Sequence, residues 1–137
     1  MTGLPSPVPD VRVRVLMSIG ACGPYAHVVA HFEPPGPDGG FELVSVAPER
    51  QLPAEYLPAL RAGLLEGLDG VAAAVLITEG SFSEVDSSEY GYRIAGRQAG
   101  RAALVASGLL PPEEAESLRW ARWPESLRWA RWPGRPV

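Results

Sequence analysis

The sequence contains no lysine, and all of its twelve basic residues are arginine. This absence excludes Schiff-base chemistry, a lysine general base and a phosphate-binding loop of the GxxxxGK[ST] type. The only cysteine, Cys22, excludes an internal disulfide and indicates a reducing, cytoplasmic compartment. No apolar run approaches ~18 residues, so no membrane-spanning helix is expected. The N-terminus also lacks the basic and apolar segments of a signal peptide.

Charge is unevenly distributed along the 137 residues, whose net charge is −4. Residues 117–137 carry five arginines and one glutamate, a net charge of +4, so the remainder carries −4 − 4 = −8. An acidic body with a short basic tail is a poor match to a broad nucleic-acid-binding surface. We therefore expect no DNA partner, and any contact with RNA must be local.

Hydrophobic periodicity predicts an α+β domain of order β-β-β-α-β-α, a two-layer sandwich with its helices on one face. The expected strands are 11–17, 26–33, 41–46 and 71–78, and the expected helices are 53–68 and about 88–107. The second and third strands should form a hairpin through PPGPDGG. The continuous apolar run VAAAVLIT predicts a strand that is central in the sheet or covered on both faces.

Three carboxylates lie close together in the stretch GSFSEVDSSEYGYRIAG, at Glu84, Asp86 and Glu89. They could be an acid/base constellation, metal ligands or the start of a helix. The run Asp86-Ser87-Ser88-Glu89 has the spacing of a capping box, in which a carboxylate reaches back to an exposed amide. Nothing else in the chain supplies a nucleophile–base pair, so a helix cap is the favoured interpretation and no catalytic residue is assigned.

Other candidate side chains have similarly simple explanations. His27 and His31 share a strand face with Glu33, but strand spacing separates the two imidazoles by about 13 Å, so no metal site is expected. Cys22 lies in a glycine loop without a nearby histidine and is interpreted as a simple thiol. Arg93, Arg97 and Arg101 follow one helix face, which favours pairing with neighbouring acids over binding to RNA phosphates.

Three motifs occur in the order of a known family across about residues 11–108. They are GPYAHVVAHFEP, LPAEYLPALRAGLLEGL and DGVAAAVLITEGSFSEVDSSEYGYRIAGRQAGRAAL. Together they resemble domain IV of translation elongation factor G. The resemblance implies a ribosomal-protein-S5-domain-2-like fold with a left-handed βαβ crossover, against the usual right-handed rule.

The resemblance also implies a binding site, because two loops at the tip of domain IV enter the ribosomal decoding centre. They correspond to residues 19–25 and 80–86. The implied contact candidates, with the arginine stripe, are Gly20, Cys22, Gly23, Tyr25, His27, Ser81, Phe82, Ser83, Arg93, Arg97 and Arg101. Cys22 stands where the family has arginine and Ser83 where it usually has histidine, which predicts a weakened contact with RNA phosphates.

The tail contains the nonapeptide ESLRWARWP twice, at 116–124 and 125–133, and holds all four tryptophans of the chain. Three interpretations are open. The tail could dock on the exposed sheet face of its own domain, bind a partner or RNA by stacking and cation–π contacts, or be an unstructured duplication. The candidate partner contacts are Trp120, Trp123, Trp129 and Trp132.

The sequence therefore predicts a proline-rich loose leader (1–10), a domain resembling elongation factor G domain IV (11–112) and a duplicated tail (113–137). The expected function is non-catalytic binding to the ribosome or a translation factor, without a cofactor or GTPase domain. One alternative is a protein-interaction or dimerisation module that uses the exposed sheet or the tail. Another is a small-molecule enzyme on the same scaffold, which would need a glycine-rich loop directly before a helix; neither GACG nor GPDGG has one.

Overall fold

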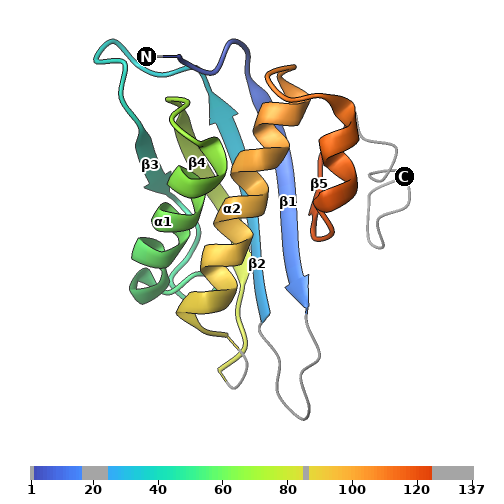
Figure 1. The fold of residues 1–137 in the computed structure, drawn as a ribbon. Helices are drawn as coiled ribbons and strands as arrows, with labels where there is room; N and C mark the ends of the chain where they lie inside the picture. Colours follow the sequence, from blue (N-terminus) through green and yellow to red (C-terminus); the bar gives the residue numbers. More distant parts are fainter. Residues whose placement is uncertain (1, 17–24, 85–86, 125–137) are drawn as a thin grey trace.

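A computed structural model describes residues 2–16, 25–84 and 87–124 of the chain. Its elements, in chain order, are β1 (Val8–Leu16), β2 (Tyr25–Glu33), β3 (Glu42–Ser45), the 3-10 helix η1 (Ala54–Tyr56), α1 (Leu57–Leu68), β4 (Ala74–Ser81), α2 (Glu89–Ala106), the 3-10 helix η2 (Pro112–Ser117) and β5 (Ala121–Arg122). Figure 1 shows α1 and α2 side by side on one face of the sheet. The predicted two-layer α+β sandwich is confirmed.

The sheet has the strand order β3-β4-β2-β1-β5, which corrects one prediction. Strands β2 and β3 do not form a hairpin, because β4 lies between them. Strand β4 pairs with β2 antiparallel from His27 to Glu33, whereas the four-residue β3 pairs with β4 in parallel at the edge. The longer and more apolar β4 buries more surface in the centre of the sheet than β3 would.

The parallel strands β3 and β4 are joined through α1 in a βαβ unit. In Figure 1 both strands run down the page, β4 lies to the right of β3, and α1 lies in front of the sheet. A crossover with this arrangement is left-handed, as the resemblance implies and contrary to the general rule.

Strand β4 is central but covered on one face only. Val75 and Ile77 point beneath the helices and are buried, whereas Leu76 between them is 38% exposed on the opposite face. The sheet therefore has a helix-covered face and an open face, and the alternation of β1 follows the same division, with Val11, Val13 and Val15 in the core.

The N-terminal segment differs from the loose leader expected from its prolines. Leu4 and Val8 are buried, and Val8 already belongs to β1. The Leu4 amide donates to the Ala72 carbonyl at 2.8 Å, and the Ala72 amide donates to the Thr2 carbonyl at 2.9 Å. Backbone pairing to the segment before β4 therefore fixes this stretch, despite a composition that is typical of a loop.

The first copy of the duplicated nonapeptide docks on its own domain, although at the sheet edge rather than on the open face. Strand β5 pairs antiparallel with β1, and Leu118, Ala121 and Trp123 are buried in the core. The nonapeptide docks at the edge because an edge strand offers unpaired backbone donors and acceptors, which a sheet face lacks. The second copy, with Trp129 and Trp132, lies outside the described residues.

Candidate functional site

Both predicted tip loops leave the same end of the sheet, at the bottom of Figure 1. The first connects Leu16 at the end of β1 to Tyr25 at the start of β2, and the second connects Ser81 at the end of β4 to Glu89 of α2. In the sheet register His27 lies directly opposite Ser81. Gly20, Cys22 and Gly23 of the first loop lie outside the described residues.

Hydroxyl groups tie the bases of the two loops together. Ser81 Oγ lies 2.7 Å from the Tyr25 hydroxyl and 3.1 Å from His27 Nδ1. Ser87 Oγ donates to the Tyr25 carbonyl at 2.9 Å and accepts from the Ser83 amide at 2.8 Å. We call Tyr25, His27, Ser81, Ser83 and Ser87 the loop-base cluster. It holds the start of β2, the end of β4 and the segment before α2 in one fixed arrangement.

Tyr92 supports the loop-base cluster from the core. Its side chain is fully buried, its hydroxyl donates to the Ser81 carbonyl at 3.1 Å, and its ring stacks on Tyr56 with centroids 4.6 Å apart. Tyr56 in turn donates its hydroxyl to the Ser87 carbonyl at 3.4 Å. The 3-10 helix η1 and helix α2 therefore brace the loop-bearing end of the sheet through aromatic side chains.

Tyr92 should also make stability depend on alkaline pH. Burial raises its pKa to about 12, from an ordinary value of about 10. Between these values the unfolded chain binds fewer protons than the native protein, so the free energy of unfolding should fall as pH rises through this window. Tyr92→Phe should reduce this fall in the free energy of unfolding, measured by urea titrations at a series of pH values. The matched Tyr90→Phe, at a residue that is 61% exposed, should not. An equal reduction by both variants would refute the assignment to Tyr92.

His27 faces the open side of the sheet, in one row with Arg14 and Ser81. Burial lowers the pKa of His27, and the nearby charges of Arg14 and Arg12 lower it further. The imidazole is therefore held toward its neutral form and acts as a hydrogen-bonding group in the loop-base cluster. The exposed Arg14 supplies the positive charge of this row, and the alternation of VRVRV could have identified it as a cation on the open face of the sheet.

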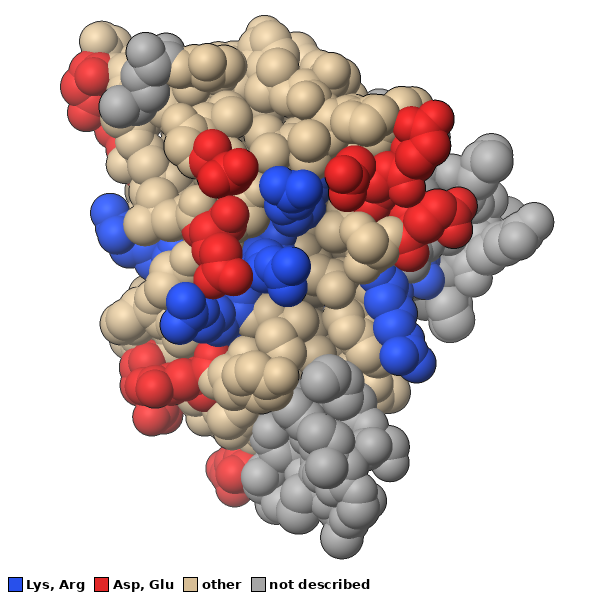
Figure 2. All heavy atoms as spheres, in the orientation of Figure 1, with Lys and Arg blue, Asp and Glu red and all other residues tan. Residues whose placement is uncertain are grey.

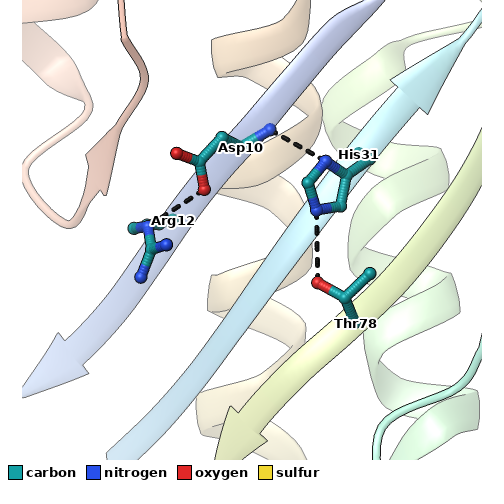
Figure 3. Close-up of polar contacts among 4 residues, drawn as sticks. All are labelled: Asp10, Arg12, His31 and Thr78. Atoms are coloured by element: carbon teal, nitrogen blue, oxygen red, sulfur yellow. Dashed lines mark hydrogen bonds and ion pairs between the residues drawn. The ribbon is translucent and has the colours of Figure 1, made fainter.

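The second histidine, His31, links three strands across the open face (Figure 3). The Asp10 amide donates to His31 Nδ1 at 3.1 Å, so the ring proton is assigned to Nε2, which donates to Thr78 Oγ1 at 3.2 Å. Arg12 pairs with the Asp10 carboxylate at 3.0 Å. The two histidines thus have separate hydrogen-bond partners. Among the described residues, no group of three or more histidine, cysteine, aspartate or glutamate side chains could hold a metal ion.

The helix cap is in a different position from the predicted capping box. Ser88 is the N-cap of α2, with an extended backbone, and its hydroxyl accepts from the Gly91 amide at 3.4 Å. Glu89 is the first helical residue, where it suits the helix dipole, and Ser87 belongs to the loop-base cluster instead. Asp86 lies outside the described residues. A serine with no carboxylate three residues later therefore caps the helix, because Gly91 occupies that position.

The arginine stripe of α2 is paired with acids. Arg93 and Arg97 both contact Glu66 of α1, at 3.1 and 3.7 Å, and Arg101 lies 3.9 Å from Glu114. Figure 2 shows arginines and acids side by side across the helical layer. This confirms the interpretation of a paired, solvated helix face. The stripe lies on the helical layer and does not converge with the loop-base cluster, because His27 of that cluster and the neighbouring Arg14 face the open side of the sheet.

Phe82 takes part in packing at the second loop. Its ring lies 6.4 Å from that of Tyr56, in a tilted arrangement, and it packs against the core while partly exposed. Of the predicted contact residues, Tyr25, His27, Ser81, Phe82 and Ser83 come together at one end of the sheet. Ser87 was missed as part of this site because its spacing also fits a helix cap.

A two-layer α+β domain with an open sheet face, and with the bases of two loops braced at one end, defines a domain of the S5-domain-2-like class. The family model for elongation factor G, domain IV, matches residues 6–108, and the chain belongs to this family. The fold is also similar to the crystal structure of a protein from Thermus thermophilus. The TM-score is 0.60 at 21% sequence identity, over 71% of this chain and 16% of that chain.

The chain therefore spans only a small part of this structural relative, and the likeness shows the fold alone. In the part of the chain that the structure describes, no helix is long and apolar enough to cross a membrane.

Proposed function

We propose that this protein is a non-catalytic, cytoplasmic, translation-related protein that binds the ribosome or a translation factor through the loop-bearing end of its sheet. The observation that carries this proposal is the loop-base cluster. Hydrogen bonds of 2.7 to 3.1 Å from Ser81 and Ser87 fix the bases of both loops relative to each other. Such bracing is what a domain needs when two loops must enter one narrow site together.

The chemistry near this end suits a local contact with RNA. Arg14 is exposed beside the neutral His27, Ser81 lies in the same row, and the Tyr25 hydroxyl lies 2.7 Å from Ser81 Oγ. Arginine and hydroxyl side chains are common partners of phosphate and sugar groups. Cys22 and Ser83 stand in place of the charged family residues, so the proposed contact, with Arg14 as its cation, is weak and sensitive to salt.

Co-sedimentation with small subunits and 70S ribosomes across a salt series tests this proposal. We expect pelleting at low salt that decreases as salt rises, and a further decrease on Arg14→Gln. Arg97→Gln removes the same charge from the helical layer, where the side chain is 64% exposed, and should leave pelleting unchanged. Absence of pelleting at every salt concentration would refute ribosome binding. Equal losses in the two variants would indicate non-specific attraction.

A second function, as a protein-interaction or dimerisation module, is favoured by one apolar strip. Val44 and Leu76 are paired in the register of β3 and β4, and both face the open side, with exposures of 53% and 38%. Val46 continues the strip at 62%. Sedimentation equilibrium of the wild-type chain and of Val44→Glu tests this function. Self-association that the substitution abolishes would support it, and a monomer at all concentrations would exclude dimerisation.

A further inference from the structure

The first nonapeptide, residues 116–124, occupies a defined site on the domain. We call it the first strap and call its contact surface on β1 and α2 the strap site. Trp123 and Leu118 are each only 4% exposed, and Ala121 is fully buried opposite Val13. The Arg14 amide donates to the Trp120 carbonyl at 3.1 Å, and the Trp120 amide donates to Gln98 Oε1 at 2.7 Å. The site thus recognises both the backbone and three apolar side chains.

The chain carries the same ligand twice. Residues 125–133, the second strap, repeat all nine residues of the first, so Leu127, Ala130 and Trp132 correspond to the three buried side chains. The repeated Trp129 can offer the same backbone carbonyl and amide. Every group that the strap site recognises within the nonapeptide is therefore present a second time, nine residues further along the chain.

We propose that the strap site is exchangeable, and that the second strap of the same chain occupies it whenever the first strap is lost or displaced. The first strap is the preferred occupant for two reasons. Its connection from α2 is residues 107–117, whereas the second strap would be connected by residues 107–126. Nearly doubling the length of a loop lowers the equilibrium constant for closing it by roughly threefold. Only the first register also keeps Glu114 of η2 beside Arg101, at 3.9 Å, and Ala115 packed on the core.

This exchange would keep the edge of β1 covered. Without a strap, β1 presents unpaired backbone groups along an arginine-bearing edge, and such edges can pair with other chains. A spare strap on the same chain returns at a high effective concentration, because it is tethered to the domain. The tail would thus act as a redundant cover for the sheet edge, in addition to any function of the two tip loops.

Point substitutions in the full chain test the proposal, whereas deletions cannot, since removing either copy yields the same sequence. Trp123→Ala should lower the folding equilibrium constant by about tenfold or less, because the second strap takes over. Trp132→Ala should have almost no effect. In the double variant the folding equilibrium constant should fall by roughly a hundredfold or more, as expected for truncating a buried tryptophan. Urea unfolding gives these constants, and the predicted signature is this strong non-additivity.

Hydrogen exchange at the Arg14 amide gives a local readout that a merely destabilised fold would not mimic. Protection of this amide should persist in Trp123→Ala and be lost in the double variant, even if the rest of the sheet stays protected. Additive losses, or an unprotected Arg14 amide in Trp123→Ala, would overturn the proposal. A dependence of Trp123→Ala stability on protein concentration would also overturn it, because the second strap would then be acting on another molecule.

Discussion

Replacing Gly96 with alanine should lower the free energy of unfolding by about 3 kcal/mol or more, enough to threaten folding. A Cβ atom at Gly96 would lie 2.4 Å from the Leu60 carbonyl oxygen of α1 and 2.8 Å from the Leu64 amide. Both neighbours are backbone atoms of a helix and cannot rotate away. In a helix interior alanine is about 1 kcal/mol more favourable than glycine. A net loss of stability would therefore come from the clash between the two helices. Urea unfolding at equilibrium provides the measurement.

The matched control is Gly40→Ala, which makes the same chemical change in a loop. A Cβ atom there would meet nothing closer than Asp38 Oδ2 at 3.9 Å, and the residue does not require a left-handed backbone. We expect a change within about 0.5 kcal/mol. If Gly96→Ala were as harmless as this control, α1 and α2 would have to sit further apart than the structure places them.

The close helix crossing is a feature that hydrophobic periodicity could not predict. Gly63 and Gly67 of α1 face Gly96 and Gly100 of α2, and a Cβ atom at Gly63 would lie 2.1 Å from the Arg93 carbonyl oxygen. In the sequence these glycines lower helix propensity, so they reduce the strength of the helix prediction instead of indicating a contact. Their function depends on the partner helix, which local patterns do not specify.

Strand order was unpredictable for a related reason. The strands themselves could be identified because apolar alternation marks a half-buried strand, as the buried Val11, Val13 and Val15 confirm. The pairing of β3 depends on competition with β4 for the same position beside β2. The connecting sequence PPGPDGG does not indicate which of the two strands takes that position. The short turn-like connection therefore suggested a hairpin that the longer β4 prevents.

The candidate site was predictable only in part. The resemblance to elongation factor G domain IV places Tyr25, His27 and Ser81 at the loop-bearing end, and the structure brings them within hydrogen-bonding distance. The resemblance gives no account of Ser87, whose hydroxyl bridges the Ser83 amide and the Tyr25 carbonyl. A serine in such a position looks like any residue before a helix, because the Tyr25 carbonyl that its hydroxyl binds is 62 residues away in the chain.

Tyr92→Ala should be the second substitution with a large effect, costing about 4 kcal/mol of unfolding free energy. Tyr92 is the largest fully buried side chain in the part of the chain that the structure describes, and its removal would leave a cavity beneath the stacked Tyr56. The Ser81 carbonyl would lose its donor as well. Chemical denaturation at pH 7 should show this loss, and a cost below about 1 kcal/mol would contradict the packing described for this ring.

Tyr92→Phe separates the packing of this ring from its hydrogen bond. The phenylalanine ring keeps the core filled, so only the bond from the hydroxyl to the Ser81 carbonyl is lost, at a cost of about 1 kcal/mol. The domain should remain folded, with its far-ultraviolet circular dichroism unchanged. If the braced end of the sheet is the binding site, the same variant should pellet less with ribosomes than the wild type does. Undiminished pelleting would mean that the contact does not depend on the position of Ser81, and would move the proposed site away from the loop-base cluster.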